Sequence, residues 1–400
     1  MNRITFLLGA GASIPAGYSS TKCLTKKIRA SENYYRHTDQ KFYRFPERPP
    51  TDYTTPIVCR IIDWLFKRTK EYFQDRGNPK ELNYEDIYYL ASQLRDDATE
   101  LQNPALLPLI RKLKCEMTLW QECRQYCQVK SILDPSYRLD FNKFCSETCH
   151  YIEDIVTDLL NDNRECCTRH LEIIKTIHEE DDLELRGIAT LAHDTHVERN
   201  LKSAGIKLAD GFRPPIPGDT LRIWKNQFSS CDGIPFIKLH GSVNWTSFEL
   251  PEPRKYEKLP QSEIGVLEPS RLEESVYLHS GGVNRPFLLI GTFNKPAQYS
   301  WGLMLDIHYR FRKILEGSDT LVVCGYSFGD KAINTQLIFW CNAERSRSLV
   351  VIDPRGRSDV INSARYAAAQ LLNDEGTTRF ITKKLEEVEP HELLEVLVSR

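Results

Sequence analysis

The stretch RITFLLGAGAS, residues 3–13, runs from a block of apolar residues directly into a turn that contains two glycines. Apolar runs of four to eight residues without polar alternation are typical of strands that are buried on both faces. Such strands form parallel sheets covered by helices, in which the carboxyl ends of the strands carry the ligand sites. Five further runs follow, and most of them end in Gly, Asp or His: GIATL (187–191), PFIKLHG (235–241), PFLLIG (286–291), TLVVCG (320–325) and LVVID (349–353).

Helical patterns lie between these strands. In SWGLMLDIHYRFRKILEG, residues 300–317, apolar side chains form one stripe and Gly317 supplies a C-terminal stop. The alternation of buried strands with amphipathic helices predicts an α/β fold, a Rossmann-like doubly wound parallel sheet. The predicted stripe of this helix consists of Trp301, Leu305, Ile307, Phe311 and Ile314.

One long segment interrupts the alternation. Residues 57–184 show apolar spacing of three to four residues almost throughout, which predicts a large helical insertion between the first and second strands. Residues 31–56 and 246–283 are polar and rich in proline, so we expect both to be irregular. The expected domains are therefore a sheet domain, residues 1–30 with 186–400, and a helical insertion, residues 31–185.

The composition is that of an ordinary globular protein. The chain has 400 residues, 41% of them hydrophobic, and a formal net charge of -2 from 53 basic and 55 acidic residues. A balanced charge gives no reason to expect direct nucleic-acid binding or attachment to a membrane surface. The sequence shows neither the pattern of a signal peptide nor a run of eighteen apolar residues, so we expect a cytoplasmic protein.

The twelve cysteines do not form a zinc-binding pattern. Cys123 and Cys127, like Cys145 and Cys149, are spaced by four residues, which puts each pair on one face of a helix. No C-x-x-C pair occurs, and Cys166–Cys167 is an adjacent doublet. We interpret the cysteines as buried or half-buried thiols and expect no metal site.

The turn after the first strand is a candidate phosphate site. Glycines at 9 and 11 allow positive φ and close approach of a ligand, and the following helix can point free N–H groups at a pyrophosphate. Ser13 adds a hydroxyl at the same level. A purely structural tight turn explains the two glycines equally well. The candidate cofactor-binding residues are Gly9, Ala10, Gly11, Ala12 and Ser13.

Three other strand ends carry candidate residues. His240 follows an apolar strand, where general bases are often placed, although a hydrogen-bonded core histidine is the more common case. Gly325, Tyr326 and Ser327 form a turn that could cradle a ribose or phosphate, and the nearby Asp330 is predicted to cap the next helix. Asp353 ends a strand and could accept hydrogen bonds from ribose hydroxyls, or could simply form an Asp-Pro turn.

Taken in order, these motifs resemble the sirtuin-like NAD-consuming family. They are the Gly-Ala-Gly-Ala-Ser turn, TLAHD (190–194), KLHGS (238–242), Gly-x-Ser (325–327) and the acid-ended last strand. The resemblance covers residues 1–30 and 186–355 and leaves the helical insertion unexplained. It is closest to bacterial antiphage-defence proteins that hydrolyse NAD to nicotinamide and ADP-ribose, and it implies a cleft that binds NAD as substrate without zinc.

The resemblance also implies specific roles. The family pattern Thr-x-Asn-x-Asp aligns Thr190 with the threonine, which contacts NAD, and Asp194 with the acid, while Ala192 stands where the family has a catalytic asparagine. His240 aligns with the catalytic histidine. A methyl group can neither hold the ribose nor orient a water. Two accounts remain: a natural pseudoenzyme, or an enzyme whose asparagine was replaced. We favour replacement, because the rest of the pattern is complete, and expect NAD binding with little turnover.

Alternatives to a NAD hydrolase remain open. The chain could be a catalytically silent sensor of NAD or ADP-ribose, or a regulatory scaffold. Deacylation is not expected, because that branch of the family needs a four-cysteine zinc module. His193 and His196 could ligate zinc only with a third ligand, and none is visible in the sequence. By resemblance we expect control through self-assembly into a homo-oligomer or through a HerA-like hexameric ATPase, in abortive infection against phage.

Overall fold

The computed structural model describes two compact units of the chain. The first comprises Met1–Ser20, Leu160–Leu289 and Phe293–Arg400, and the second comprises Thr21–Leu159 with Ile290–Thr292. These bounds differ from the expected insertion at 31–185, since the helix before residue 31 groups with the second unit and the residues from 160 onward with the first. The residues described are 1–30, 33–75, 81–95, 107–135, 139–161, 169–214, 221–228, 233–249, 262–266, 285–291, 295, 299–300, 302–365 and 367–398.

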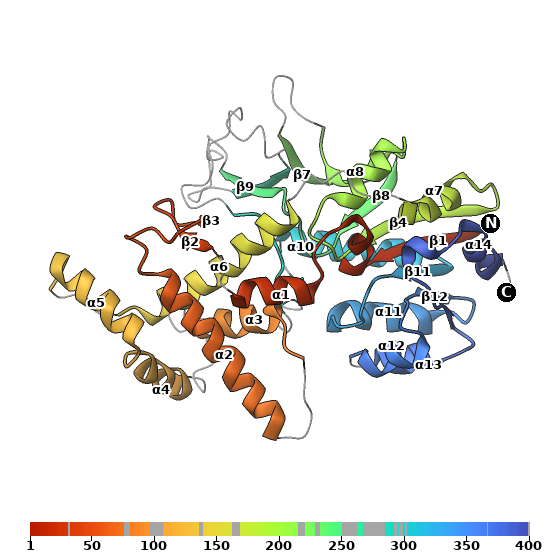
Figure 1. The fold of residues 1–400 in the computed structure, drawn as a ribbon. Coiled ribbons are helices and arrows are strands. Elements are labelled where there is room, and N and C mark those ends of the chain that lie inside the picture. The colour runs from red at the N-terminus through yellow and green to blue at the C-terminus, as the bar shows by residue number, and fades with distance from the viewer. Residues whose placement is uncertain are drawn as a thin grey trace. The chain divides into compact units, whose positions relative to one another are not determined.

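The first unit is built on a seven-stranded sheet in the order β13-β12-β11-β1-β4-β8-β5, and every strand pair in it is parallel. The strand order reverses direction at β1, which is the mark of a doubly wound, Rossmann-like sheet and confirms the predicted fold class (Figure 1). The strands are β1 (Asn2–Leu8), β4 (Leu183–Thr190), β5 (Leu208–Ala209), β8 (Ile234–Lys238), β11 (Thr320–Cys324), β12 (Ser348–Ile352) and β13 (Thr378–Ile381).

Two apolar layers cover the sheet because successive side chains of a strand point to opposite faces. On β1, Phe6 and Leu8 belong to one buried cluster and Leu7 to the other. Helices α7 (Glu172–Glu179), α8 (His196–Ser203) and α14 (Pro390–Val398) contribute to the cluster of Phe6. The cluster of Leu7 receives α10 (Gly302–Glu316), α11 (Lys331–Ala343), α12 (Arg357–Ser363) and α13 (Ala368–Asn373).

The pairing register sets the carboxyl ends of the central strands level with one another. Leu8 of β1 pairs with Cys324 of β11 on one side and with Thr190 of β4 on the other. Thr190 in turn pairs with Lys238 of β8. The loops that follow these four strands therefore begin at the same edge of the sheet, which we call the carboxyl edge.

Several local predictions are wrong. Residues 286–291 form no strand, because Leu288 makes only an isolated bridge with Gly241. Leu305 is 50% exposed, so it does not belong to the buried stripe of α10; the predicted Ile307 and Phe311 are buried, together with Met304. The strands β5 and β13 were missed. Trp301 lies outside the described residues.

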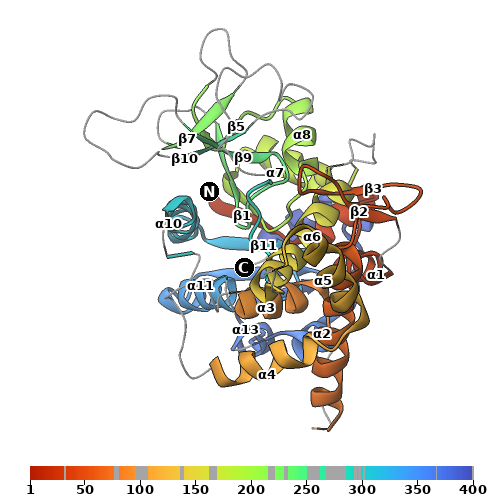
Figure 2. The same ribbon diagram turned by 90° about the vertical axis from the view of Figure 1, so that its left-hand side faces the viewer.

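A second, antiparallel sheet belongs to the same unit, in the order β6-β7-β10-β9. Its strands β7, β9 and β10 are grouped in Figure 2. Two of the strands fall in the stretch 246–283 for which an irregular structure was expected, so that expectation is wrong for them; residues 250–261 and 267–284 lie outside the described part. The strands are β6 (Gly211–Phe212), β7 (Arg222–Gln227), β9 (Trp245–Glu249) and β10 (Ser262–Val266).

The second unit is mainly helical, as the apolar spacing predicts. The expectation of an irregular stretch at 31–56 is wrong in part, because β2 (Tyr34–Arg36) and β3 (Phe42–Arg44) pair as an antiparallel hairpin. Its inward aromatic side chains, Tyr34 and Phe42, are buried. The helices are α1 (Thr21–Ala30), α2 (Thr55–Asp75), α3 (Tyr84–Arg95), α4 (Leu107–Met117), α5 (Gln121–Leu133) and α6 (Phe141–Leu160).

The cysteines of this unit lie in its helices. Cys123, Cys145 and Cys149 are buried and Cys127 is half-buried, in line with the interpretation as packed thiols, whereas Cys115 is exposed and contradicts it. Burial raises the pKa of the Cys145 thiol to about 12, so it stays protonated at neutral pH. The doublet Cys166–Cys167 lies outside the described residues.

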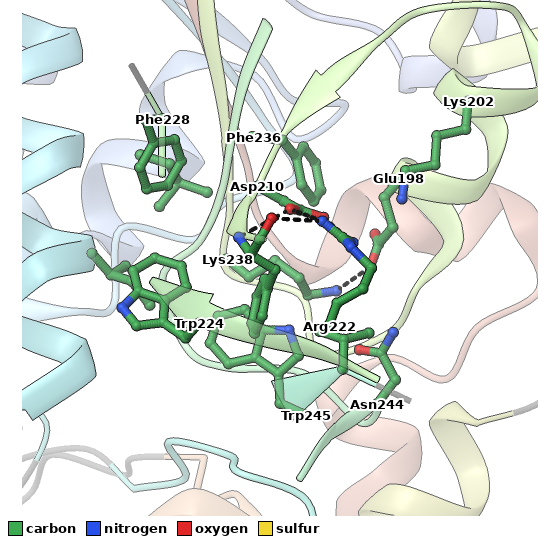
Figure 3. Close-up of a pocket in the computed structure, with 14 residues that line it drawn as sticks. Glu198, Lys202, Asp210, Arg222, Trp224, Phe228, Phe236, Lys238, Asn244 and Trp245 are labelled. Atoms are coloured by element: carbon green, nitrogen blue, oxygen red, sulfur yellow. Dashed lines mark hydrogen bonds and ion pairs between the residues drawn. The ribbon is translucent and has the colours of Figure 1, made fainter. Parts of the chain in front are cut away.

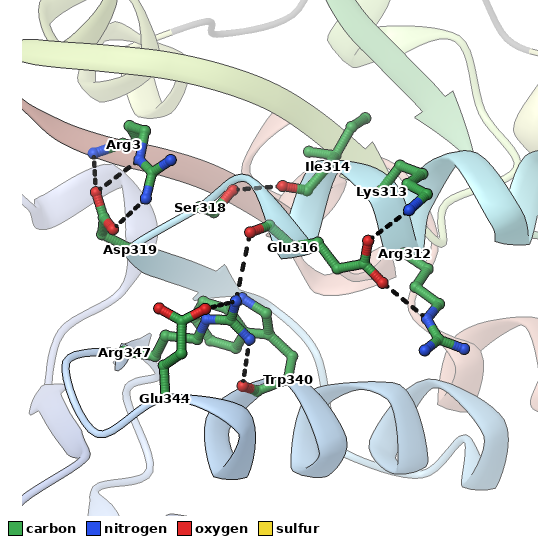
Figure 4. A network of polar contacts seen from close by, with 10 residues as sticks. All are labelled: Arg3, Arg312, Lys313, Ile314, Glu316, Ser318, Asp319, Trp340, Glu344 and Arg347. Carbon is green, nitrogen blue, oxygen red and sulfur yellow. Dashed lines mark hydrogen bonds and ion pairs between the residues drawn. The ribbon is translucent and has the colours of Figure 1, made fainter.

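Polar contacts join the starts of the strands at the opposite edge of the main sheet, which we call the amino edge (Figure 4). Arg3 meets Asp319 through two hydrogen bonds of 2.8 and 3.0 Å. The buried Arg347 donates to the carbonyl oxygens of Trp340, at 2.8 Å, and Glu316, at 3.3 Å. Charged and backbone groups at this edge thus satisfy one another.

In the described residues, we find no helix whose length and hydropathy would let it cross a bilayer.

Candidate functional site

Backbone hydrogen bonds join the four loops at the carboxyl edge. The loop after β1 binds the loop after β11, the loop after β4 binds the end of β1, and the loops after β4 and β8 bind each other. Such contacts between loops bring residues together that are far apart in the chain. The bonds are Gly9 N to Cys324 O (2.8 Å), Gly11 N to Gly325 O (3.0 Å), Leu191 N to Leu8 O (2.8 Å), Leu239 N to Thr190 O (2.8 Å) and Val243 N to His193 O (2.9 Å).

The glycines of the first loop allow its backbone to pass close to the backbone of the loop after β11. A Cβ atom on Gly9 would lie 2.2 Å from the carbonyl oxygen of Gly325, and one on Gly11 would lie 2.7 Å from the same atom. Gly325 has φ of 62°, whereas Gly9 has φ of -81°. The expectation of positive φ at Gly9 and Gly11 is therefore wrong, and their role is steric.

The helix that follows this turn is a short 3₁₀ helix, η1 (Ala10–Ala16), and not the α-helix expected to face a pyrophosphate. Ala10 is exposed, while Ala12 and Ser13 are buried. Ser13 Oγ has no hydrogen-bond partner among the described residues. A buried hydroxyl without a partner is unusual in a folded protein, so Ser13 is the residue of this loop that fits a polar ligand group.

The loop after β4 is held by its own side chains. Thr190 Oγ1 accepts a hydrogen bond from Ala192 N at 3.1 Å, and Asp194 Oδ1 accepts one from His196 N at 3.0 Å. The Asp194 carbonyl also accepts from Lys238 Nζ. Thr190 and Asp194 therefore shape the turn that carries the buried Ala192.

His240 belongs to a buried triangle of polar groups. Its Nε2 lies 2.8 Å from Tyr299 OH and 3.2 Å from Asp330 Oδ2. Tyr299 OH also donates to Asp330 Oδ2 at 2.9 Å. Sequence reasoning missed Tyr299, because nothing near it in the chain resembles a site. An imidazole held by a carboxylate and a phenol is oriented for proton transfer.

Asp330 has two tasks. Its Oδ1 accepts from the N–H groups of Ala332, at 2.9 Å, and Ile333, at 3.1 Å, which is the predicted N-cap of α11. Burial alone would raise the pKa of Asp330, but the hydrogen bond with His240 and the charges of His240 and Lys295 outweigh it and lower the pKa below its ordinary value. The carboxylate is therefore ionised at neutral pH and faces the imidazole.

A second histidine supports the triangle from α10. The ring of His308 stacks on Tyr299 with ring centres 3.6 Å apart. His308 Nδ1 lies 3.2 Å from Gln336 Nε2, and Nε2 lies 3.3 Å from the carbonyl of Leu239. Burial lowers the pKa of His308 to about 3, so the ring is neutral and fixed.

His193 lies beside His240, with ring centres 6.1 Å apart. It follows Ala192 directly, is 6% exposed, and its Nδ1 has no partner among the described residues. His196, by contrast, turns toward His170, with 3.2 Å between the two Nε2 atoms. In the part of the chain that the structure describes, no group of three potential metal ligands occurs, and His193 and His196 do not share a site.

The remaining candidate residues make local contacts. Tyr326 OH donates to Asn334 Oδ1 at 2.8 Å and accepts from Asp330 N at 3.1 Å, which fixes the loop after β11. Ser327 is exposed. Asp353 pairs with Arg355 through both carboxylate oxygens, at 2.9 and 2.8 Å. A ribose at Asp353 would have to share the carboxylate with this guanidinium.

A separate small cavity lies beside β8 (Figure 3). Lys238 on its wall pairs with Glu198 at 2.9 Å, and Asp210 pairs with Arg222 at 2.8 Å. Aromatic rings of Trp224 and Trp245 complete the wall. Its volume is about 40 Å³, and a water needs about 10–15 Å³. The cavity has room for a few waters and is too small for a dinucleotide.

No family model matches the chain, and no curated protein matches it. Among solved structures it is similar to a Sir2 homologue mutant in complex with ADP-ribose, at 13% identity and a TM-score of 0.40, covering 99% of this chain and 91% of the other. It is also similar to a Sir2 homologue in complex with NAD, at 12% identity and a TM-score of 0.39, covering 99% and 89%. Sir2Tm bound to a propionylated peptide matches at 11% identity and a TM-score of 0.37, covering 98% and 92%. At this distance the fold class rests on the strand order of the chain itself.

Proposed function

We propose that the chain binds NAD across the carboxyl edge of the main sheet, with the nicotinamide ribose beside His240, on the scaffold of an NAD hydrolase. The observation that carries this proposal is the buried triangle of His240, Tyr299 and Asp330 at the edge where α/β sheets bind dinucleotides. Two features support it: the order of motifs resembles sirtuin-like proteins, and Ser13 Oγ in the adjoining loop has no partner among the described residues.

The hydrolysis balances as NAD⁺ plus water giving nicotinamide, ADP-ribose and a proton. The bond between ribose C1′ and the pyridinium nitrogen breaks, its electron pair leaves with nicotinamide, and water oxygen bonds to C1′. His240 would take the proton from a ribose hydroxyl or from the water. The ionised Asp330 and the hydroxyl of Tyr299 orient the ring, and the carboxylate stabilises the imidazolium that forms.

Ala192 limits this chemistry. Its buried methyl group lies in the loop beside His193, where an asparagine amide would hold the ribose and position the water. We propose that this chain retains NAD binding with little or no turnover, and that a parent with asparagine at 192 is the active NAD hydrolase. By resemblance alone, that activity would deplete NAD in antiviral defence, within a homo-oligomer or under a HerA-like ATPase.

Ala192 also favours a second function, a silent sensor of NAD or ADP-ribose. A sensor needs the oriented pocket but not the amide. The two functions differ in what an asparagine at 192 would do, because only a disabled hydrolase regains turnover.

The test is the variant Ala192→Asn, assayed for nicotinamide release and compared with the unaltered chain and with Ala192→Asn/His240→Ala. Restoring a group that positions the reactants should raise the rate about 100-fold or more, and removing the base should abolish the gain. Calorimetric titration of NAD into the unaltered chain tests binding separately. Binding without turnover in Ala192→Asn supports the sensor, and absence of binding in every variant refutes the proposal.

A further inference from the structure

The loop after β4 holds a buried ring nitrogen to which no described residue makes a hydrogen bond. His193 is 6% exposed, and its Nδ1 has no hydrogen-bond partner among the described residues. Buried polar atoms are almost always paired, so each exception calls for an explanation. A group absent from the folded chain, such as a ligand or a water, is the simplest one.

The protonation state of the ring defines what that group must be. Burial lowers the pKa of His193 well below its ordinary value, and the charges of His240, Lys295 and Lys238 lower it further. The backbone of Gly241 acts in the opposite direction and raises the pKa. We place the proton of the neutral ring on Nε2, because Nδ1 has no acceptor among the described residues. A neutral ring then presents only a lone pair at Nδ1 and requires a donor.

The position of this lone pair relates it to the proposed substrate. His193 follows the alanine that stands in place of the amide, and its ring centre is 6.1 Å from that of His240. Two further hydrogen bonds fix the loop. The carbonyl oxygen of His193 accepts from Val243 N at 2.9 Å and from Ser242 Oγ at 3.3 Å. These contacts hold the backbone of His193, and the buried ring lies next to the imidazole that would meet the nicotinamide ribose.

We propose that His193 Nδ1 accepts a hydrogen bond from the nicotinamide-ribose half of NAD, either a ribose O–H or the carboxamide N–H, and so replaces part of the contact that Ala192 cannot make. This inference rests on the proposed function. It also predicts a ligand preference. A lone pair at Nδ1 stabilises a ligand that donates a hydrogen bond and repels the lone pairs of a carboxylate. Ligands that carry nicotinate instead of nicotinamide separate the two possible donors.

The test is calorimetric titration of NAD, ADP-ribose and nicotinic acid adenine dinucleotide into the unaltered chain, His193→Phe and His170→Phe. His170 is the matched control, since it is also buried with an unpartnered Nδ1 among the described residues but pairs with His196 instead of lying beside His240. We expect His193→Phe to weaken NAD binding about tenfold and His170→Phe to leave it unchanged.

The three ligands identify the donor. If the ribose hydroxyl donates, His193→Phe weakens NAD and ADP-ribose alike. If the carboxamide donates, it weakens NAD alone, and the unaltered chain prefers NAD to the nicotinate analogue, a preference that the variant loses. Either result supports the proposal.

A second measurement guards against a misfolded variant. In the unaltered chain with ¹⁵N-labelled histidine, the Nδ1 signal of His193 should shift upfield on NAD binding, as expected of a lone pair that begins to accept a hydrogen bond. The proposal is overturned if NAD binds equally to His193→Phe and leaves the Nδ1 signal in place. Failure of the unaltered chain to bind NAD at all would instead refute the proposed function.

Discussion

The two edges of the main sheet are built differently. At the amino edge, Arg3, Asp319 and Arg347 pair with charged groups and backbone carbonyls, and the strands begin in a bonded network. At the carboxyl edge, backbones cross in contact at Gly9 and Gly325, while the buried Ser13 Oγ and His193 Nδ1 find no partner among the described residues.

This difference between the two edges suggests that the amino edge contributes mainly to stability and the carboxyl edge mainly to ligand binding. The side chains of Arg3, Asp319 and Arg347 at the amino edge have partners within the fold, so removing one should cost stability and leave binding unchanged. Polar groups at the carboxyl edge are partly unsatisfied, so removing one should cost little stability and change binding. Glycine positions form an exception, because there the backbone itself is packed.

The largest effect is expected at the crossing of the two loops. Gly9→Ala would place its Cβ 2.2 Å from Gly325 O and 2.6 Å from Tyr326 Cα, two backbone atoms that cannot turn aside. We expect a loss of about 3 kcal/mol or more in the free energy of unfolding, measured by urea denaturation. The control is Gly329→Ala, whose Cβ would meet only Ser327 Oγ at 3.4 Å. Equal stability of the two variants would show that the crossing is loose.

The next effect concerns pH. The pKa of His308 falls from 6.5 in the unfolded chain to about 3 in the folded one, so between these values the unfolded chain binds more protons. The free energy of unfolding is then highest above pH 6.5 and falls as the pH decreases toward 3, by about 2 kcal/mol between pH 7 and 5 from this group alone. Urea denaturation at both pH values should show a smaller drop for His308→Gln. An unchanged drop would contradict a neutral buried ring.

A similar loss is expected at the amino edge from Arg347→Met. The substitution leaves the carbonyls of Trp340 and Glu316 without this donor, and we expect a cost of about 2 kcal/mol. Arg312→Met is the control, because Arg312 is 73% exposed and its ion pair with Glu316 should contribute less than about 0.5 kcal/mol. Urea denaturation measures both. NAD affinity should be unchanged. A weakened affinity would contradict the expectation that the amino edge contributes to stability and not to binding.

Tyr299→Phe should have a smaller effect on stability. It removes the hydroxyl that contacts His240 Nε2 and Asp330 Oδ2, at an expected cost of about 1 kcal/mol. In the Ala192→Asn background it should also shift the pH profile of nicotinamide release, since one partner of the imidazole is lost. Tyr309→Phe, at a side chain that is 53% exposed, is the control for both measurements. An unshifted profile would mean that Tyr299 does not orient His240.

The smallest effect on stability is expected at Ser13, and it tests the difference between the two edges most directly. Ser13→Ala removes a buried hydroxyl that has no partner in the described part of the chain, so the free energy of unfolding should change by less than about 0.5 kcal/mol or rise slightly. If Ser13 meets the dinucleotide, NAD affinity measured by calorimetry should nevertheless fall. A clear loss of stability would show that the hydroxyl has a partner in the folded chain.

The strands that carry the sheet could be predicted because their sequences are continuously apolar. β1, β4, β8, β11 and β12 each overlap an expected run, although β4 begins at Leu183 and the expected run at Gly187. β13 could not, because TRFI is short and places Arg379 in the strand. Residues 286–291 are equally apolar, yet Leu288 finds only one bridge, since an apolar run shows that a segment is buried without showing that a neighbouring strand is free to pair.

The candidate site was predictable only where a residue ends a strand or begins a helix. His240 and the cap Asp330 carry such local signals, whereas Tyr299 lies 59 residues from His240 and 31 from Asp330 in sequence and joins them through the fold alone. The glycine pattern was correctly singled out but given the wrong physical reason. A close contact between two backbones requires glycine, and so does a turn that a ligand approaches closely, so the residue type alone does not separate the two.

The divided carboxylate of Asp330 has a mechanical consequence. One oxygen holds the first turn of α11 and the other holds the imidazole, so the helix and the ring are coupled through a single rigid group. A longer acid would displace one of the two, and an amide would keep the cap while giving up the charge. The orientation of His240 is therefore set by the first turn of a thirteen-residue helix that is anchored in the core. It does not depend on the stiffness of the loop in which the histidine lies.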